Sequence, residues 1–264
     1  MLPPPTLLRT WQLPARNIGR IVFVYDSVDS TNNIAADLAH DPANAGMAVL
    51  AGEQTAGRGQ YGRSWQSPPG AGVWLSVLLA PPPDLRRPVL LTAWAAIAVA
   101  DTASELTGHP TRVKWPNDVL LAGRKVCGIL IEQTQGTVVG IGLNVNQTPE
   151  QFAAAGLPDA TSLAAVSGQT FDRDAVASLL LNNLDAGYEV LQHGDMTLLE
   201  SAWREQLDLA GEIVSIELGD GTVHRGRLKV LSFAGLAIER TGGGVSRFTP
   251  EAVREVRPDR GRSG

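Results

Sequence analysis

A segment rich in glycine and arginine is the first place in this sequence where the residue types indicate chemistry. It runs from Gln54 to Gly70, carries Arg58 and Arg63, and no acidic residue occurs between Glu53 and Asp84. Glycines let consecutive backbone N–H groups turn toward an anion, and arginines add forked donors for phosphate or carboxylate oxygens. The segment therefore predicts an anion-binding loop, although a solvated surface hairpin can have the same composition.

Residues 57–62 also satisfy the G-x-G-x-x-G pattern of dinucleotide-binding loops. That pattern has this meaning only when it opens a helix and an acidic ribose ligand follows about twenty residues later. Here the chain continues into Ser67-Pro68-Pro69-Gly70 and then into a strand candidate at 72–79. We therefore expect a strand–loop–strand segment and no dinucleotide site of this type.

Two further segments place polar groups where apolar strands end. Lys114-Trp115-Pro116-Asn117-Asp118 has the chemistry of a tight turn, and Gly123-Arg124-Lys125 brings a second lysine shortly afterwards. A hairpin with solvated lysines is the alternative interpretation. Farther along, Asn144 ends an apolar run, and its amide could contact an adenine edge or cap a turn.

Composition limits the class of protein. The 264 residues are 44% apolar and 19% charged with a net charge of -5, which argues against a general nucleic-acid binder. A single cysteine, Cys127, and no export signal in the first ten residues favour a cytoplasmic location. The longest apolar stretch, Val89 to Ala100, is shorter than the roughly 20 residues that span a bilayer. The four histidines show no metal-ligand spacing, so no zinc site is expected.

The order of expected elements indicates an α+β (α/β) fold with a mixed or antiparallel sheet. The expected strands are 21–25, 47–52, 72–79, 111–115, 126–132 and 138–144, and the expected helices start at Ser30 or Thr31 and cover 85–106, 173–191 and 197–206. From Leu209 the pattern changes to short strands and turns. We predict a catalytic domain over 1–208, a small β domain over 209–258 that packs on it, and a disordered tail over 259–264.

Taken together, these segments resemble the catalytic domain of the biotin–protein ligases. The matching pieces, which occur in the family's order, are Ser30-Thr31-Asn32, Gln54-Thr55-Ala56-Gly57-Arg58-Gly59, Gly62-Arg63-Ser64-Trp65, Lys114-Trp115-Pro116-Asn117-Asp118, Gly123-Arg124-Lys125, Gly128-Ile129-Leu130 and Gly142-Leu143-Asn144. The likeness spans residues 24–146, and the run from Lys114 to Asp118 is its most specific part. It implies a class II synthetase-like mixed sheet with flanking helices, of the biotin/lipoate ligase type, and a small C-terminal SH3-like β-barrel.

The resemblance implies an ATP-dependent enzyme that forms biotinyl-5′-AMP. Biotin would then pass to a lysine of a biotin carboxyl carrier protein, of a carboxylase such as acetyl-CoA carboxylase. Mg²⁺ would accompany ATP, with no metal ligand assigned. Composition and charge, rather than the resemblance, predict a cytoplasmic enzyme without nucleic-acid or membrane partners. The resemblance allows a homodimer through the catalytic sheet.

The resemblance also implies roles for individual residues. Biotin would be bound by Ser30, Thr31, Asn32, Gln54, Gly57, Arg58, Gly59, Gln60 and Lys125. ATP and the adenylate would be bound by Arg58, Arg63, Trp65, Asn117 and Asn144, and the catalytic residues would be Lys125, Arg63, Lys114 and Asp118. In these roles Lys125 faces the carboxylate and the bridging phosphate, whereas Lys114 and Asp118 organise ATP and magnesium.

One position departs from the family's pattern. Many relatives carry a third arginine where this chain has Gln60, two residues after Arg58. A neutral amide cannot neutralise an acyl-phosphate, so Gln60 predicts that biotinyl-5′-AMP escapes more quickly from this protein than from a relative with arginine.

Three other functions compete with biotin ligation. A lipoate–protein ligase or octanoyl transferase shares the fold but uses another acyl group, and the Lys114 to Asp118 run with the Gly/Arg loop favours biotin. A biotin-responsive repressor would need a winged helix, and only 29 residues precede Ser30. A catalytically inactive vitamin-binding module is disfavoured because Lys125 and Arg63 are both present.

Overall fold

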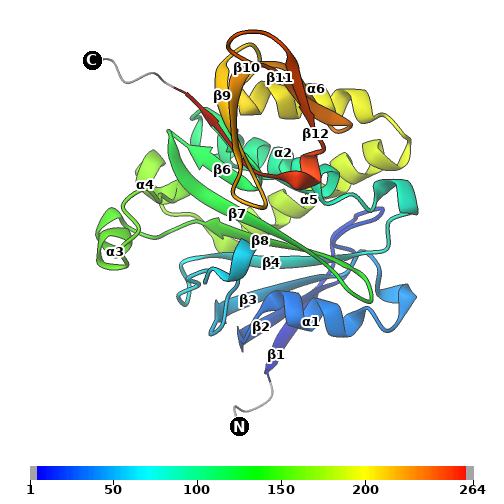
Figure 1. Cartoon of the computed structure of the whole chain (residues 1–264). Coiled ribbons are helices and arrows are strands. Elements are labelled where there is room, and N and C mark those ends of the chain that lie inside the picture. The colour runs from blue at the N-terminus through cyan, green and yellow to red at the C-terminus, as the bar shows by residue number, and fades with distance from the viewer. Residues whose placement is uncertain (1–4, 260–264) are drawn as a thin grey trace.

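An eight-stranded sheet forms the centre of the larger part of the structure (Figure 1), a computed structural model that describes residues 5–259. Its strands are β1 (Leu7–Trp11), β2 (Val22–Val28), β3 (Ala48–Gln54), β4 (Gly72–Leu79), β5 (Thr111–Lys114), β6 (Asp118–Leu121), β7 (Arg124–Gln133) and β8 (Thr137–Asn144). Their order across the sheet is β1-β2-β3-β4-β8-β7-β6-β5, and only β2 and β3 pair in parallel. The predicted α+β fold with a mixed sheet is confirmed.

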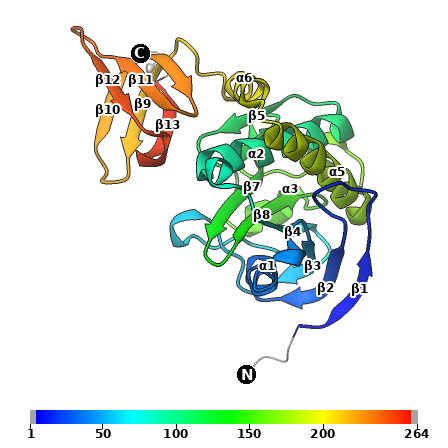
Figure 2. The ribbon, with the colours of Figure 1, turned by 90° about the vertical axis from the view of Figure 1, so that its right-hand side faces the viewer.

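The two faces of this sheet are covered unequally (Figure 2). Helix α1 (Thr31–Leu38) packs on one face over β3, β4 and β8, whereas α2 (Pro88–Thr107) packs on the other face and is itself covered by α5 (Arg173–Gln192) and α6 (Met196–Leu207). Because successive strand residues point to opposite faces, Leu75 and Val77 of β4 enter the large core beneath α2, while Ser76 points toward α1. Since α1 has only eight residues, it leaves much of its face open.

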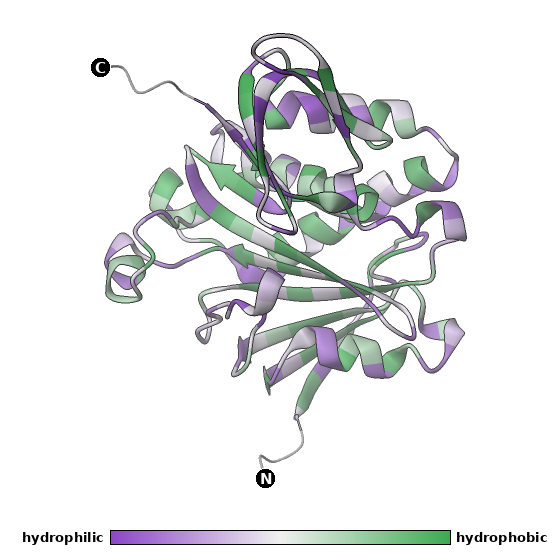
Figure 3. Cartoon of the chain, viewed as in Figure 1, coloured by the Kyte–Doolittle hydropathy of each residue, from purple (hydrophilic) through white to green (hydrophobic). Residues whose placement is uncertain are grey.

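Helix α2 is apolar nearly all round, and the structure explains why (Figure 3). It lies between the sheet and two other helices, so it has no broad solvent-facing side. Pro88 occupies its first turn and Gly108, with φ +70°, ends it. By length and composition this helix could cross a membrane, but 67% of its apolar window is buried within the protein. It is therefore the core helix that the sequence predicts.

A second, five-stranded sheet follows α6 and carries the C-terminal part of the chain. Its strands are β9 (Ile213–Leu218), β10 (Val223–Ser232), β11 (Gly235–Glu239), β12 (Val245–Phe248) and β13 (Val253–Pro258). They are arranged in the order β12-β11-β10-β9-β13, and each neighbouring pair is antiparallel. Val214, Ile216, Leu228 and Ile238 fill its interior.

Three aromatic side chains attach this second sheet to the first. The ring of Trp203 on α6 lies 5.6 Å from that of Trp115 and 4.9 Å from that of Phe233, which follows β10. The indole N–H of Trp115 donates to the carbonyl of Val253 at the start of β13, over 3.1 Å. All three rings are buried. The contact holds the second sheet against the end of the first sheet where β5 lies.

Replacing Phe233 by alanine is expected to lower the free energy of unfolding by about 3 kcal/mol, because it removes a buried ring from this aromatic contact. Urea titration followed by tryptophan fluorescence would measure the change. Val230→Ala is the matched control, since Val230 lies three residues earlier, on β10, with 47% of its surface exposed and should change stability by about 0.5 kcal/mol at most. Equal stability of the two variants would show that the aromatic contact does not hold the sheets together.

Several short elements go beyond the sequence-based expectation. They are β1, β6, β13, α3 (Pro149–Ala154) and α4 (Leu163–Ser167), none longer than six residues. The strand expected over 111–115 ends at Lys114, because the β5–β6 turn begins at Trp115. The predicted disordered tail, 259–264, lies outside the described residues except for Asp259. The N–H of Asp259 donates to the Ile213 carbonyl, and its carboxylate pairs with Arg225.

Candidate active site

A cavity of about 400 Å³ opens on the uncovered part of the sheet face beside α1. Its walls come from the start of α1, the loop after β3, the β5–β6 turn, the middle of β7 and β8, the segment 147–160, and β13 of the second sheet. Every predicted site residue except Gly57 lines it: Ser30, Thr31, Asn32, Gln54, Arg58, Gly59, Gln60, Arg63, Trp65, Lys114, Asn117, Asp118, Lys125 and Asn144. The fold thus brings four separate sequence segments, 30–32, 54–65, 114–125 and Asn144, to one place.

The glycine-rich loop forms a hairpin over the cavity. The N–H of Trp65 donates to the carbonyl of Gly57 over 2.9 Å, and that of Gly59 donates to Arg63 over 2.7 Å. A Cβ on Gly57 would lie 2.4 Å from the Trp65 carbonyl oxygen, so Gly57 serves the closure of the hairpin and does not line the cavity. The chain then enters β4, which confirms the strand–loop–strand prediction.

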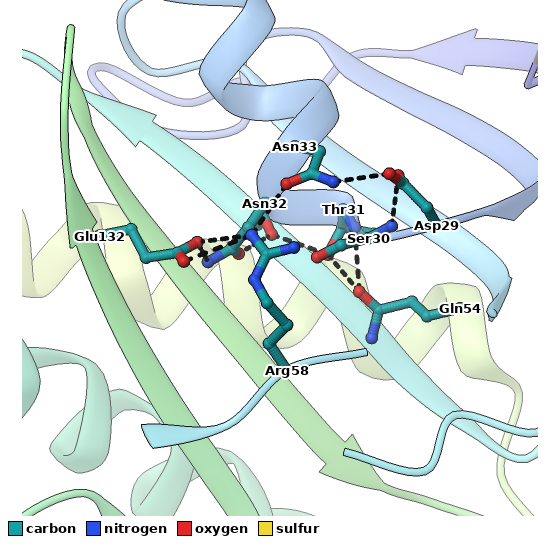
Figure 4. A network of polar contacts seen from close by, with 9 residues as sticks. Asp29, Ser30, Thr31, Asn32, Asn33, Gln54, Arg58 and Glu132 are labelled. Atoms are coloured by element: carbon teal, nitrogen blue, oxygen red, sulfur yellow. Dashed lines mark hydrogen bonds and ion pairs between the residues drawn. The ribbon is translucent and has the colours of Figure 1, made fainter. Parts of the chain in front are cut away.

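One end of the cavity, here called the polar end, is lined by the uncharged side chains of Thr31, Asn32 and Gln54 (Figure 4). The hydroxyl groups of Ser67 and Ser76, which are buried and do not line the cavity, form hydrogen bonds with these three side chains. Gln54 Oε1 accepts from the Thr31 N–H at 2.9 Å, and Gln54 Nε2 donates to Ser67 Oγ at 2.8 Å. The Ser76 hydroxyl lies 2.7 Å from Thr31 Oγ1 and 2.5 Å from Asn32 Oδ1. These groups form a fixed set of donors and acceptors suited to a neutral polar ligand.

Ser30 adjoins the polar end at the start of α1. It occupies the N-cap position, as predicted, but its side chain makes no capping hydrogen bond. Its residue surface is only 3% exposed, and it lines the cavity. The hydroxyl is therefore not committed to the helix and is positioned for a ligand.

Glu132, at the end of β7, links α1 to the loop above the cavity. One of its carboxylate oxygens accepts from Asn32 Nδ2 at 2.6 Å and from Arg58 Nη2 at 3.0 Å (Figure 4). The same Arg58 nitrogen donates to Asn33 Oδ1 over 2.8 Å. The loop is thereby attached to both β7 and α1.

The other end, here called the cationic end, carries Arg63, Lys114 and Lys125. Lys125 Nζ lies 2.6 Å from Asp118 Oδ1 and 5.2 Å from the centre of the Trp65 ring. Both side chains of the Lys125–Asp118 pair are partly exposed, at 34% and 20%. The arrangement holds an ammonium group at the cavity wall, where it can meet an anion.

Between the two ends, the indole of Trp65 lies in a trough formed by two glycines. Gly128 of β7 and Gly142 of β8 are paired across the strands, and a Cβ on Gly142 would lie 2.4 Å from the indole nitrogen. A Cβ on Gly128 would lie 2.9 Å from the same ring. The indole N–H is buried and has no hydrogen-bond partner among residues 5–259. A side chain at either glycine would displace the ring.

Both asparagines expected near adenine use their amide groups within the protein. Asn117 Nδ2 donates to the Ile129 carbonyl over 2.7 Å. Asn144 Nδ2 donates to the Thr161 carbonyl over 3.0 Å, and its Oδ1 accepts from Gln147 over 3.0 Å. Asn144 thereby holds the segment that returns over the cavity, while its contact with a nucleotide stays a prediction.

The second sheet contributes two charged residues to the cavity. Arg254 lies 5.0 Å above the ring of Tyr61 in the glycine-rich loop, and Glu255 lies 3.8 Å from Lys114. A hydrogen bond from Arg257, helped by the charges of Lys114 and Arg63, holds the pKa of Glu255 below its ordinary value although burial opposes this. Glu255 is therefore ionised at neutral pH and balances the cationic end.

Sequence reasoning missed Ser76, Glu132, Gln147, Arg254 and Glu255. Glu132 could have been singled out as a carboxylate that ends an apolar strand. The two residues of β13 give no such signal, because they lie about 140 positions after Lys114 in an ordinary charged strand.

The structure offers no ready metal cage and no reactive thiol at this site. Within residues 5–259, no three His, Cys, Asp or Glu side chains come together as a possible metal site. Cys127 lies two positions after Lys125, but it is fully buried, and burial raises the pKa of its thiol. The cavity therefore presents hydrogen-bonding and cationic groups, without a cysteine nucleophile.

Comparison with known proteins agrees with this geometry. Residues 24–146 match the model of the Biotin/lipoate A/B protein ligase family. The chain is 35% identical over 247 residues to the bifunctional ligase/repressor BirA of Bacillus subtilis, covering 90% of this chain and 73% of that protein. It is 37% identical over 209 residues to the biotin--[acetyl-CoA-carboxylase] ligase of Mycobacterium tuberculosis, covering 74% of this chain and 75% of that protein.

Among solved structures, the fold is similar to that of the biotin protein ligase from Aquifex aeolicus in complex with biotin and ATP. The TM-score is 0.73 at 29% sequence identity, with 90% of this chain and 98% of that chain covered. The similarity therefore extends beyond residues 24–146 to nearly the whole of the Aquifex protein. The sequence match, the shared fold and the composition of the cavity together place this chain in the biotin/lipoate A/B protein ligase family, among the biotin protein ligases.

Proposed function

We propose that this chain is an ATP-dependent biotin–protein ligase that forms biotinyl-5′-AMP and transfers biotin to a lysine of a biotin carboxyl carrier protein. The observation that carries this proposal is the division of one cavity into a polar end and a cationic end. Along β8, Gly140 adjoins Asn32 at the polar end, and Gly142 adjoins Trp65, which in turn lies beside Lys125. Biotin has a neutral ureido ring at one end and a carboxylate at the other, so it matches this division.

In the first half-reaction, a carboxylate oxygen of biotin attacks the α-phosphorus of ATP, and the bond to pyrophosphate breaks. Two anions must approach each other, so the cationic end has to be in place before the reaction. Lys125 is held by Asp118 and is assigned to the carboxylate and the bridging phosphate, and Arg63 is assigned to phosphate oxygens. No protein nucleophile is needed.

In the second half-reaction, the ε-amine of the acceptor lysine attacks the carbonyl carbon of the mixed anhydride. The bond to AMP breaks, AMP leaves with the electron pair, and the amine loses a proton as the amide forms. Water must be kept away meanwhile. The hairpin that closes at Gly57 and Trp65 covers the cavity and is suited to this role.

Magnesium would accompany ATP. Mg²⁺ is usually held by one or two carboxylates together with substrate phosphates and water, and Asp118 supplies a carboxylate at the cavity beside Lys125. Bound there, the ion would neutralise charge on the phosphates. Asp118 and Lys114 are therefore assigned to the nucleotide side.

The polar end favours biotin over lipoate or octanoate as the acyl group. Ser30 and Thr31 line the cavity and are each 3% exposed, and a dithiolane ring or an alkyl chain has no N–H or carbonyl group to pair with their hydroxyl groups. A site built to form hydrogen bonds discriminates strongly against an analogue that lacks the partner groups. The polar end alone would also suit an inactive vitamin-binding module. The cationic end beside it favours an enzyme instead.

Transfer to an acceptor tests the complete reaction. Incubating the protein with labelled biotin, ATP, Mg²⁺ and a biotin carboxyl carrier domain is expected to label that domain on one lysine, identified by mass spectrometry. A carrier domain in which that lysine is replaced by arginine is the control. Labelling that persists in the arginine variant, or that does not depend on ATP, would contradict the proposal.

Replacing Gln60 by arginine is expected to slow the dissociation of biotinyl-5′-AMP by about five- to tenfold, because the residue lines the cavity and an arginine would add a cation near the phosphate. Stopped-flow measurement of the release of the intermediate gives the rate. Gln169→Arg makes the same charge change at an exposed position far along the chain and should leave the rate unchanged. If Gln60→Arg released the adenylate as fast as the native protein, Gln60 would have no part in its retention.

The remaining properties are proposals of the same kind. We propose a catalytic domain over 1–208 and an SH3-like β domain over 209–258. The boundary falls between α6, which ends at Leu207, and β9, which begins at Ile213. A homodimer through the catalytic sheet and a carboxylase such as acetyl-CoA carboxylase as acceptor follow from the family resemblance. A cytoplasmic location follows from the single cysteine, and the absence of nucleic-acid binding from the net charge of -5.

A further inference from the structure

We infer that Glu132 is a positioning residue that couples the loop carrying Arg58 to the polar end of the cavity. Its kinetic consequences rest on the proposed function, whereas its effect on the loop does not. Glu132 belongs to neither end of the cavity itself. It acts through two residues that do line it, Asn32 and Arg58.

The first step of the argument is the orientation of the Asn32 amide. Asn32 Nδ2 donates to the Glu132 carboxylate over 2.6 Å, so its Oδ1 faces the opposite way, toward Ser76 at 2.5 Å. The amide lies against the bare backbone of Gly140, where a Cβ would come within 2.3 Å of Oδ1. A carboxylate can only accept hydrogen bonds, so an ionised Glu132 fixes which side of the amide faces Ser76.

The second step is the direction of the hydroxyl protons. Since Asn32 Oδ1 is an acceptor, Ser76 must give its single proton to it. The single Thr31 hydroxyl proton then lies between two acceptors, Ser76 Oγ at 2.7 Å and Gln54 Oε1 at 3.1 Å. The donors of Ser76 and Asn32 both point toward Glu132, and hydrogen bonds in such a chain strengthen one another. Thr31 Oγ1, at the cavity wall, consequently keeps lone pairs that can accept an N–H from a ureido ring.

The third step is the loop. Arg58 Nη2 binds the same carboxylate at 3.0 Å and Asn33 Oδ1 at 2.8 Å, so the group that orients the polar end also anchors the hairpin (Figure 4). The Arg58 and Glu132 side chains are 39% and 35% exposed. Solvent therefore weakens the attraction between the two charges without abolishing it. Loop position and ligand orientation therefore depend on one charge.

The Glu132→Gln variant separates this role from simple packing, because it keeps the size of the side chain and removes the charge. An amide can present its NH₂ group to Asn32, which allows the chain of protons to reverse, and it forms no ion pair with Arg58. We expect KM for biotin in pyrophosphate exchange to rise about tenfold with kcat changed by less than about threefold. In an Arg58→Gln background, Glu132→Gln should add less than about a twofold change, since the two groups act as a pair.

Limited trypsin digestion supplies a test that needs no substrate. Cleavage after Arg58, identified by mass spectrometry, is expected to be about fivefold faster in Glu132→Gln than in the native protein without ligand, because the loop has lost its anchor. Glu239→Gln is the control: it removes a carboxylate that pairs with Lys229 at 2.9 Å in the second sheet, and it should alter neither KM nor cleavage.

The outcomes distinguish the inference from the proposed function. Faster cleavage together with a raised KM would support the coupling. Native-like cleavage in Glu132→Gln, or equal effects of Glu132→Gln in native and Arg58→Gln backgrounds, would overturn it. If the native protein showed no biotin-dependent exchange, the proposed function would fail, and the cleavage comparison would still decide whether Glu132 anchors the loop.

Discussion

Replacing Lys125 by alanine is expected to reduce biotin-dependent exchange of pyrophosphate into ATP by about 100- to 1000-fold, the range found when a single preorganised group for developing negative charge is removed. Its ammonium group is fixed at the cavity by Asp118 at 2.6 Å and lies 5.2 Å from the centre of the Trp65 ring. Without it, the carboxylate of biotin and the α-phosphate meet with less charge compensation. The exchange assay isolates the first half-reaction, so no acceptor protein is needed.

Two variants control this result. Lys229→Ala removes an equally charged residue that pairs with Glu239 over 2.9 Å in the second sheet, and it should leave exchange unchanged. Lys125→Arg keeps the charge but replaces a compact ammonium by a planar guanidinium, so we expect intermediate activity. Exchange within a few-fold of native in Lys125→Ala, with unchanged thermal stability, would remove Lys125 from the proposed mechanism.

Replacing Gly142 by alanine is expected to lower kcat/KM for biotin by about 100-fold, because a displacement of catalytic groups by even an ångström can have an effect of that size. The new Cβ would lie 2.4 Å from the indole nitrogen of Trp65. The ring cannot stay in the trough, and its displacement would alter the cavity wall and the contact with Lys125. Steady-state exchange kinetics with varied biotin would measure the loss.

Two other glycines make this prediction specific. Gly128→Ala places a Cβ 2.9 Å from the far edge of the same ring and should cost less than Gly142→Ala. Gly219→Ala, in a turn of the second sheet with no atom within 4 Å of the new Cβ, should cost nothing in activity. The same activity in all three variants would mean that the position of Trp65 in the trough does not matter for the reaction.

Much of the fold could be predicted from the sequence because its long elements have clear periodicity. Strand β4 is buried along its whole length and α2 is covered on nearly every side, so both appear as uninterrupted apolar runs. The missed elements lack that signal. Strand β1 is an edge strand with four of five residues exposed, and β6 has only four residues between two turns.

The sequence allowed a prediction of those parts of the candidate site in which several functional groups lie close together along the chain. The glycine-rich loop and the Lys114 to Asp118 turn each carry several functional groups within a few residues, and the structure places both at one cavity. Glu132 meets Asn32 across 100 positions of chain, and Glu255 meets Lys114 across 141. Such contacts depend on strand order and on the packing of the second sheet, which local patterns do not encode.

Biotin-dependent exchange of labelled pyrophosphate into ATP by the native protein, with lipoate and octanoate as parallel acids, tests the central claim most directly. We predict rapid exchange with biotin and background exchange with the other two acids, because only biotin supplies partners for Thr31 and Gln54 at the polar end. Exchange with lipoate or octanoate in place of biotin, or with none of the three acids, would contradict the assignment of this cavity to biotin activation.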